Sequence, residues 1–446
     1  MQLFGKISSF TQNNSFGKIR TYILCGVKEM GKRIIFHVDV NSAYLSWEAV
    51  YRLQHGDSLD LRTIPSIVGG NPETRHGIVL TKSIPAKKYG IQTGETLHTA
   101  LAKCPELVII PPNYGLYMQC SKAFGDILRE YSPLVEQYSI DEYFMDFSNM
   151  ERLFKDPVVA AYMLKDRIKS ELGFTVNIGV STNKILAKMA SELQKPDKVH
   201  TIFPDEIAEK MWVLPIEELF MVGRATSKKL RSRGIRTIGD LAHYDPKLIK
   251  PFLHSHGLLV WNYANGIECN PVRENRRPII KGMGNSTTIA FDIDDRKTAH
   301  LVLLSLTETV ATRLRQSGYC ARLVSVSFRT NEFFDCSHQR KIFSAIDCTN
   351  AIYEVARELF DELWKCEPIR HLGIRVSELC QNDFQQMTFF EKDYAKQRAV
   401  DRAIDSIRER FGNGSVFRSA FLNSGVRFSS GGTMDDEEYP MMSSQL

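Results

Sequence analysis

Apolar residues in the first half of the chain form short strand-like runs separated by helix-like stretches. The clearest run, Ile34–Val38, is β-branched and ends at an acidic residue, and residues 42–53 then follow a helical period. Further strands are predicted at Ile78–Thr81, Leu107–Ile110, Glu136–Tyr138, Tyr143–Phe147 and Thr175–Val180, and helices at Tyr117–Tyr131, Val158–Leu172 and Ile185–Lys195. This alternation predicts an α/β domain.

Two further units are predicted downstream of Pro215. Residues 221–250 hold eight Lys or Arg against two Asp, a local surplus larger than the net charge of +5 for the whole chain. Residues 270–285 are rich in Pro, Gly and Arg, which is typical of a basic linker. A third unit then extends to about Leu422 in a βαββαβ-like order, with strands at Ile289–Ile293, Leu323–Thr330 and His371–Leu379 and helices at His300–Ser317 and Ala351–Trp364.

The composition is typical of a globular protein with several domains. The 446 residues suggest about three folding units, and the 43% hydrophobic and 24% charged residues exclude a mostly disordered, collagenous or coiled-coil chain. The nine Cys residues include no C-x-x-C pair, and no apolar run approaches the roughly 18 residues of a membrane span. We therefore expect a soluble, cytoplasmic protein with free thiols.

Acidic residues occur at the ends of two predicted strands. Asp39 follows Ile34–Val38, and the pair Asp141-Glu142 lies directly before Tyr143–Phe147. Burying such carboxylates is costly unless they are paired or bind a metal, and Mg²⁺ prefers a few carboxylates together with substrate phosphates. A pair of such ions suits phosphoryl transfer. The alternative, edge-strand carboxylates that face water, is equally open on these residues alone.

Lysines are the candidate phosphate-binding groups, because the chain contains no G-x-x-x-x-G-K-[ST] loop. Lys82, Lys87 and Lys88 follow one predicted strand, and Lys184, Lys188 and Lys195 follow another. A lysine can bind phosphate as a point charge. For any single lysine, a solvated position on a helix is the more common alternative.

Several segments together resemble the Y-family DNA polymerases, the translesion enzymes, and most closely their bacterial polymerase IV and UmuC-like branch. Residues 36–44 (FHVDVNSAY) look like the first metal motif, and residues 139–142 (SIDE) are similar to the S-[IL]-D-E signature. Residues 179–184 (GVSTNK) and Lys195-Pro196 resemble two further palm motifs, in the same order and at similar distances. The resemblance covers roughly residues 34–421.

The resemblance implies a right-hand polymerase of class α/β (α+β). It implies a palm and fingers over residues 33–215, with the fingers at about 50–112, and a helical helix-hairpin-helix thumb over 216–270. A basic linker over 271–285 would lead to a βαββαβ-like little finger over 286–422. Residues 1–32 would be an N-terminal extension and residues 423–446 a disordered tail.

The resemblance also implies roles for individual residues. Asp39, Asp141 and Glu142 would carry catalysis and, with the backbone carbonyl of Val40, hold two Mg²⁺ ions. Tyr44 stands at the steric-gate position, where an aromatic ring leaves no room for a ribose 2′-hydroxyl; without the motif, a core Tyr would be the preferred interpretation. The positions that match triphosphate-binding residues are Thr81, Lys87 and Lys195.

The sequence departs from the family pattern at three positions. Asn41 replaces a common second Asp that does not make the main metal contact. Ile84 stands where many members have a phosphate-contacting Tyr, and Lys87 stands where they have Arg. Isoleucine cannot donate a hydrogen bond and lysine cannot form the bidentate fork of arginine, so these two changes affect nucleotide affinity and the triphosphate pose.

Contacts with DNA and with a partner protein are also implied. Residues 220–230 look like a helix-hairpin-helix, in which Gly223, Arg224, Lys228 and Lys229 would bind DNA phosphates; a solvated basic helix is the alternative. Residues 386–390 (QMTFF) resemble the peptide that docks on the bacterial sliding clamp. In that peptide Gln386, Met387, Phe389 and Phe390 would make the contacts, and the alternative is the end of a core strand.

The function implied is a template-directed, error-prone translesion DNA polymerase that acts on primer-template DNA and dNTPs. We expect a monomer without membrane association or proofreading activity. One alternative is a DNA-binding, UmuC-like subunit that is catalytically weak and depends on partners. A second alternative, a palm-fold nucleotidyl cyclase, is disfavoured because a cyclase needs neither the basic segment nor the third unit.

Overall fold

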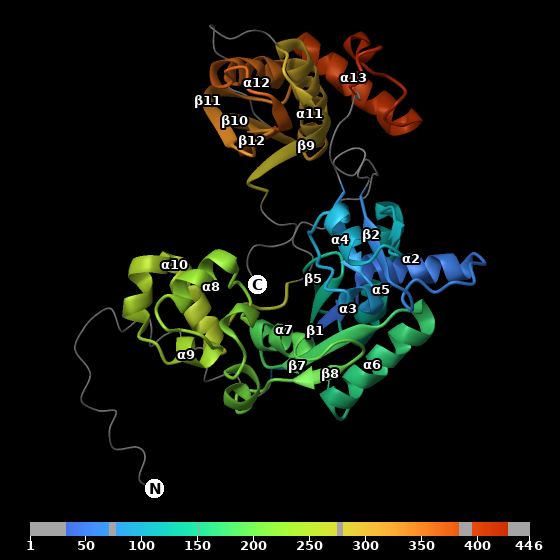
Figure 1. Ribbon diagram of the computed structural model, residues 1–446, viewed down its shortest axis with the longest axis vertical. Coiled ribbons are helices and arrows are strands. Elements are labelled where there is room, and N and C mark those ends of the chain that lie inside the picture. The colour runs from blue at the N-terminus through green and yellow to red at the C-terminus, as the bar shows by residue number, and fades with distance from the viewer. Residues whose placement is uncertain (1–32, 71–76, 151, 274–279, 383–394, 427–446) are drawn as a thin grey trace.

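The computed structural model describes residues 33–70, 77–150, 152–273, 280–382 and 395–426 (Figure 1). Its central feature is a five-stranded sheet in the order β5-β6-β1-β7-β8. The strands of this sheet are β5 (Val135–Gln137), β6 (Glu142–Asp146), β1 (Ile35–Val40), β7 (Val176–Ser181) and β8 (Val199–Thr201). Strand β1 pairs antiparallel with both β6 and β7 and is buried along its whole length, as its continuous apolar run predicts.

Residues of β1 alternate between the two faces of this sheet. Phe36, Val38 and Val40 belong to a core shared with the helices α2, α5 and α6, whereas Ile35 belongs to the core that contains helix α7. The helices are α2 (Ala43–Gln54), α5 (Tyr114–Tyr131), α6 (Pro157–Leu172) and α7 (Lys184–Glu192). His37 and Asp39 therefore face the same side as α7.

A second, smaller sheet has the order β3-β2-β4 and its own apolar core. Its strands are β2 (Ser66–Gly69), β3 (Val79–Lys82) and β4 (Val108–Ile110), with the short helices α3 (Ile84–Lys88) and α4 (Leu97–Lys103). Strands β3 and β4 agree with the sequence prediction. Strand β2 was not predicted, because its four residues lead into Gly69-Gly70, which favours a loop.

The basic segment forms a helical unit, residues 216–264, that packs on α7. It contains α8 (Arg224–Arg231), α9 (Ile238–Ala242) and α10 (Pro246–Ala264). Apolar side chains of these helices and of α7 form one continuous core. The helix α10 bends at His254, whose φ of 53° and ψ of −137° are not helical.

An anchor ties the chain that leaves the helical unit to the five-stranded sheet. The Glu136 Oε2 atom accepts a hydrogen bond from the Lys184 ammonium group at 2.5 Å and another from the Arg273 backbone N–H at 2.6 Å. The Asn183 side-chain amide donates to the Gly266 carbonyl at 2.8 Å, and the Glu268 carboxylate accepts from the Lys184 backbone N–H at 3.2 Å. Lys184 is fully buried, so this lysine is a structural group rather than a phosphate ligand.

The third unit, residues 280–382 and 395–426, has a four-stranded antiparallel sheet in the order β11-β10-β12-β9. Its strands are β9 (Gly282–Ile293), β10 (Tyr319–Thr330), β11 (Asp335–Ile346) and β12 (Ile369–Gln381), and the helices α11 (Arg296–Gln316) and α12 (Thr349–Leu363) share one core with the sheet. The βαββαβ order is confirmed. Strand β11 was not located, because this edge strand is largely exposed and carries mostly polar residues.

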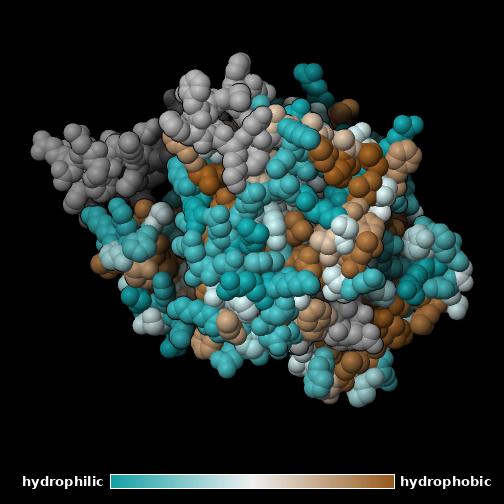
Figure 2. Space-filling view, turned by 90° about the horizontal axis from the view of Figure 1, so that it is seen from above, coloured by the Kyte–Doolittle hydropathy of each residue, from teal (hydrophilic) through white to brown (hydrophobic). Residues whose placement is uncertain are grey.

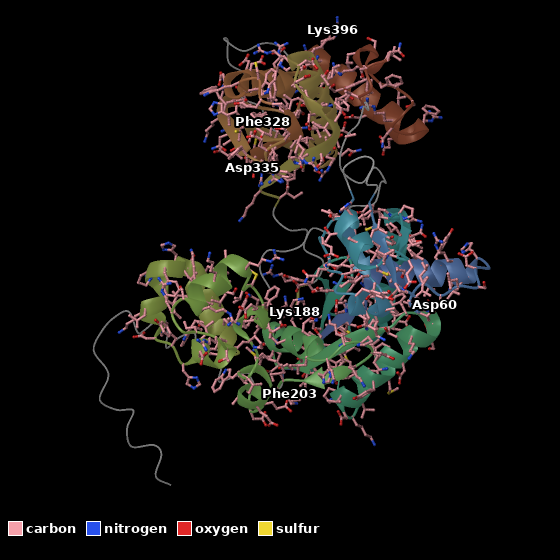
Figure 3. All side chains as sticks on the ribbon, in the orientation of Figure 1. Asp60, Lys188, Phe203, Phe328, Asp335 and Lys396 are labelled. Carbon is pink, nitrogen blue, oxygen red and sulfur yellow. The ribbon has the colours of Figure 1, made fainter. Side chains whose placement is uncertain are left out.

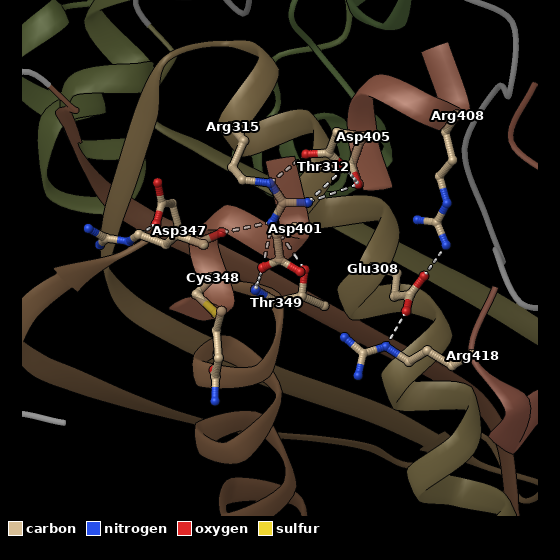
Figure 4. Close-up of polar contacts among 12 residues, drawn as sticks. Glu308, Thr312, Arg315, Asp347, Cys348, Thr349, Asp401, Asp405, Arg408 and Arg418 are labelled. Carbon is tan, nitrogen blue, oxygen red and sulfur yellow. Dashed lines mark hydrogen bonds and ion pairs between the residues drawn. The ribbon is translucent and has the colours of Figure 1, made fainter. Parts of the chain in front are cut away.

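A further helix, α13 (Ala395–Phe411), is held against α11 by buried ion pairs (Figure 4). The Arg315 guanidinium group contacts Asp405 at 2.6 Å and Asp401 at 3.4 Å, and Glu308 contacts Arg408 at 2.8 Å and Arg418 at 2.5 Å. The face seen in Figure 2 is mainly hydrophilic, with hydrophobic side chains in scattered groups. Within the described ranges, none of the helices combines the length and apolar character needed to cross a membrane.

Candidate active site

The pairing of β1 with β6 brings the three predicted carboxylates together at the ends of these two strands. Asp39 and Glu142 are directly opposite each other in the antiparallel register. The Val40 N–H group donates to the Asp141 carbonyl at 3.1 Å, so that Asp141 lies beside the end of β1. The predicted convergence of Asp39, Asp141 and Glu142 from neighbouring strands is thus present in the structure.

Asp39 is buried and contacts the Lys195 ammonium group. Burial raises the pKa of Asp39 to about 7, against the attraction of Lys195, and the nearby charges of Glu142 and Asp141 add to the increase. Lys195 also contacts Glu192 at 2.8 Å. Burial alone would lower the pKa of Lys195, but these two carboxylates raise it, so the lysine keeps its charge.

Glu142 is held by two groups from the α7 side of the sheet. Its Oε2 atom contacts the Lys188 ammonium group and lies 3.2 Å from His37 Nε2. Burial alone would raise the pKa of Glu142, but the hydrogen bond with His37 and the charge of Lys188 hold it well below its usual range. Burial lowers the pKa of His37 to about 4, so the imidazole is neutral near pH 7 and Lys188 provides the positive charge.

Asp141 is the third carboxylate of the group. Its Oδ1 atom accepts a hydrogen bond from the Ser139 hydroxyl at 2.6 Å, which fixes the side chain within its own turn. Burial raises the pKa of Asp141, although the hydrogen bond from Ser139 acts in the opposite direction. Asp39 and Asp141 therefore both have a raised pKa, mainly because they are buried and to a lesser extent because other carboxylates lie nearby.

The carboxylates suit a divalent cation by their chemistry, although they do not form a ready-made ligand set. Among the described residues, no group of three or more His, Cys, Asp or Glu side chains has the arrangement of a metal site. Here Lys195 and Lys188 neutralise Asp39 and Glu142. Buried carboxylate oxygens are hard ligands of the kind that Mg²⁺ prefers, and the charge of the ion would stabilise their ionised form. Their role as metal ligands stays a prediction.

The predicted gate residue Tyr44 lies in the first turn of α2, close in sequence to the end of β1. Its half-buried ring stacks on Tyr117 of α5, with ring centroids 4.5 Å apart and an angle of 8° between the ring planes. Ser42, just before the helix, has a φ of 51° and turns the chain sharply from β1 into α2. Strand and helix therefore place Asp39 and Tyr44 near the same turn.

The predicted triphosphate-binding residues are divided between two parts of the structure. Lys195 lies at the carboxylates, whereas Thr81 is on strand β3 of the second sheet and Lys87 is on the short helix α3 that follows it. Lys87 is exposed, and Thr81 is half-buried. Ile84, the apolar departure from the family pattern, is exposed at the start of α3. The triphosphate assignment of Thr81 and Lys87 stays a prediction.

The predicted DNA-binding residues lie along α8, with Gly223 and Arg224 at its start and Lys228 and Lys229 in its last turn. Gly223 is the residue before the helix, and Arg224, Lys228 and Lys229 are exposed on it. A groove of about 520 Å³ lies between α7 and the residues before α8, and its lining includes Lys188, Glu192 and residues 217–223. Figure 3 labels Lys188 near the helical unit. The predicted clamp peptide with Gln386, Met387, Phe389 and Phe390 lies outside the described residues.

His37 and the partner of Tyr44 were not predicted from the sequence as parts of the site. A polar side chain inside the apolar run Ile34–Val38 is the signal that could have indicated His37, since a fully buried imidazole needs a partner. His37 Nδ1 lies 2.7 Å from the Ser191 hydroxyl on α7, while its Nε2 atom contacts Glu142. No local pattern connects Tyr44 with Tyr117, which lies more than 70 residues away.

Comparison with known proteins places these features in a family. The impB/mucB/samB family model matches residues 38–192, and the model of that family's C-terminal domain matches residues 280–389. DNA polymerase IV of Clostridium acetobutylicum is 46% identical over 391 residues, which cover 87% of this chain and 98% of the relative. DNA polymerase IV of Acetivibrio thermocellus is 38% identical over 396 residues, covering 88% and 98% of the two chains.

A solved structure agrees with this relationship. A Y-family DNA polymerase chimera of Dbh and Dpo4 superposes with a TM-score of 0.66 at 22% identity, covering 78% of this chain and 100% of the chimera. At that identity the likeness concerns the fold alone, and it supports the right-hand architecture expected from the sequence motifs. The chain therefore belongs to the impB/mucB/samB family of Y-family DNA polymerases.

Proposed function

We propose that the chain is a template-directed translesion DNA polymerase that adds dNTPs to a primer 3′-hydroxyl with low fidelity. One observation carries the proposal: Asp39, Asp141 and Glu142 meet at adjacent strand ends, beside Lys188 and Lys195. The relatives named DNA polymerase IV support it, since the matches cover 87% and 88% of the chain and 98% of each relative.

The residues of the site divide the work of nucleotidyl transfer. Asp39, Asp141, Glu142 and the backbone carbonyl of Val40 would hold two Mg²⁺ ions, which, when bound, supply Lewis acidity to the 3′-hydroxyl and the phosphates. Lys195 can offer its ammonium group to the triphosphate. Lys188 keeps Glu142 ionised, and the neutral His37 fixes the orientation of that carboxylate. Catalysis then rests mainly on positioning and electrostatics.

The units of the fold take the roles that the family implies. In this proposal the five-stranded sheet is the palm, the second sheet the fingers, the helical unit the thumb and the third unit the little finger. Thr81 and Lys87 reach the triphosphate from the fingers. Gly223, Arg224, Lys228 and Lys229 grip phosphates of the primer-template duplex from the thumb. Residues 386–390 tether the enzyme to a sliding clamp, which raises its local concentration at the primer end.

Primer extension by the purified full chain, with Mg²⁺ and dNTPs on undamaged and abasic templates, tests the proposal. Asp141→Ala should reduce extension by at least about 100-fold, because it removes one of the carboxylates that would hold the Mg²⁺ ions, and these ions would stabilise the negative charge of the transition state. Its affinity for primer-template DNA, measured by fluorescence anisotropy, should stay within about twofold of wild type. Asp146→Ala is the matched control: it lies at the other end of β6, where Asp146 accepts from the Ser148 N–H.

The outcomes separate the proposal from its alternative. Extension that crosses the abasic site in wild type and Asp146→Ala but is lost in Asp141→Ala supports the translesion polymerase. Extension retained in Asp141→Ala removes that residue from catalysis. Wild-type protein that binds DNA but extends no primer would favour the partner-dependent, UmuC-like subunit.

A further inference from the structure

The ring of Tyr44 packs against two apolar clusters, and one side chain of α5 stacks directly on it. Tyr117, which is fully buried on α5, stacks against Tyr44 almost parallel, at 4.5 Å and 8°. Tyr114, one turn earlier on α5, meets both rings edge-on, at 6.2 Å from Tyr44 and 5.8 Å from Tyr117. One face of the Tyr44 ring therefore stacks on Tyr117. The rings of Tyr114 and of Trp47, whose centroid lies 6.0 Å from that of Tyr44, limit its tilt.

Tyr117 is in turn held by a buried carboxylate. Its hydroxyl donates to Glu48 Oε1 at 3.0 Å. Glu48 lies one turn after Tyr44 on α2, so that the two residues share a face of the helix and hold Tyr117 by its ring and by its hydroxyl. Burial raises the pKa of the Tyr117 hydroxyl, so it remains a donor at any ordinary pH.

Glu48 is not an ordinary surface charge. It is only 4% exposed, and the nearest cation, the Arg52 guanidinium group, lies 3.8 Å away. Burial raises the pKa of Glu48, whereas the hydrogen bond from Tyr117 acts to lower it. Keeping a carboxyl group in such a place costs free energy, which points to a positional role for the hydrogen bond it accepts.

We propose that Tyr117 and Glu48 are positioning residues that fix the height and tilt of the Tyr44 ring and thereby set the discrimination between deoxyribonucleotides and ribonucleotides. The inference rests on the proposed function, in which Tyr44 is the steric gate. Excluding a single hydroxyl group requires a wall placed to within a fraction of an ångström. When the partner stacked on its face is removed, the Tyr44 ring can shift toward the space left behind, and the 2′-hydroxyl then gains room.

A purely structural role of Tyr117 makes a different prediction. Loss of a buried aromatic residue from α5 would weaken folding and reduce binding of both kinds of nucleotide together. The ratio of the two affinities would then remain constant. Phe124 provides the comparison, since it is fully buried on the same helix but contacts Tyr143 and Phe174 instead of Tyr44.

The experiment measures the affinities of dATP and ATP for the full-length protein on a primer with a 3′-dideoxy end, opposite template thymine and with Mg²⁺ present. This readout needs no turnover. Wild type should prefer dATP, and Tyr44→Ala should lose most of that preference. Tyr117→Leu should reduce the dATP preference about three- to tenfold, the range expected for an aromatic pair. Glu48→Gln should reduce it about two- to threefold, because a weaker acceptor remains. Phe124→Leu should leave it unchanged.

Each result decides the matter. A reduced preference in Tyr117→Leu with a constant one in Phe124→Leu supports the positioning role. An unchanged preference in Tyr117→Leu overturns it, as do equal changes in Tyr117→Leu and Phe124→Leu or a wild-type protein that shows no preference at all. Failure of the proposed function is recognised separately, as a wild-type enzyme that discriminates between the sugars but extends no unblocked primer.

Discussion

Lys188 lies between the carboxylates at the strand ends and the helical unit. Its ammonium group contacts Glu142 and lies 5.2 Å from the ring centroids of both Tyr138 and Phe220. Phe220 belongs to the loop before α8. The Lys188 side chain therefore contacts both the candidate catalytic residue Glu142 and the segment that leads into the basic helix. Aromatic ring faces attract a cation, so both rings stabilise the position of the ammonium group.

The sequence predicted the carboxylates and indicated Lys188 and Lys195 as candidate phosphate-binding groups, but it did not predict that these lysines pair with the carboxylates. Asp39, Asp141 and Glu142 can be identified because they lie at the ends of apolar runs and match two motifs of the family. His37 contacts Glu142 because β1 pairs with β6, and Lys188 contacts it because α7 packs on the sheet. The same packing brings the Ser191 hydroxyl to His37 across 154 positions of sequence. Local periodicity carries no information on such a contact.

The packing of α7 on β7 depends on Gly179. A methyl group added at this position would lie 1.9 Å from the Ala187 carbonyl oxygen and 2.5 Å from the Ser191 backbone nitrogen. Gly179→Ala should therefore destabilise the protein by about 3 kcal/mol or more, because backbone atoms cannot rotate away. The free energy of unfolding in guanidinium chloride measures this.

A second glycine provides the reference for that measurement. A Cβ atom added at Gly223 would have no neighbour within 4 Å, and the φ of Gly223 is negative. The free energy of unfolding of Gly223→Ala should therefore lie within about 0.5 kcal/mol of the wild-type value. Equal stabilities of the Gly179 and Gly223 variants would contradict the close approach of α7 to β7.

At the scale of elements, α13 depends on charge rather than on a large apolar face. Arg315 of α11 is 7% exposed and forms a two-atom contact with the Asp405 carboxylate, at 2.6 and 2.9 Å. Glu308, 6% exposed, joins Arg408 and Arg418. Sequence patterns placed this segment in the third unit without predicting the helix itself, since its partners lie about 90 residues upstream.

Arg315→Met should release α13 from α11. Removal of one partner leaves buried carboxylates uncompensated, which costs about 3–5 kcal/mol. We expect rapid proteolytic cleavage within residues 395–411 under conditions in which wild type resists.

Arg340→Met is the matched control on the same unit, because Arg340 pairs with Glu358 and Glu362 on an exposed part of the surface. Such pairs contribute about 0–1 kcal/mol, so this variant should be cleaved no faster than wild type. Cleavage of both variants at the same rate would mean that α13 is not held by Arg315.

At the scale of the whole molecule, positive charge is concentrated in one unit. The helical unit exposes Arg224, Lys228 and Lys229 on α8, whereas the first unit pairs several of its basic residues with carboxylates. The order of the units and the basic character of the second one followed from the sequence. Their connection did not, since the Glu136 anchor joins residues 137 positions apart.

The charge distribution predicts the salt dependence of DNA binding. If Lys228 and Lys229 each neutralise one phosphate, replacing both by Gln should reduce the slope of log affinity against log salt by up to about 1.8. Fluorescence anisotropy between about 50 and 200 mM salt measures it.

Exchange of two exposed lysines elsewhere, Lys122→Gln with Lys155→Gln, removes the same net charge from the first unit. This control should change the slope by much less. A slope that falls equally in both double variants would assign the effect to net charge and not to a DNA contact of α8.

The anchor at Glu136 has a consequence for protein engineering. Because Gly266, Glu268 and Arg273 are fastened to the five-stranded sheet, the path of the chain out of the helical unit is set before the third unit begins. A homologous third unit could be joined after Arg273, or residues could be added or removed there, without disturbing the packing of α8, α9 and α10. Arg273 therefore marks a natural seam for building chimaeras from this protein.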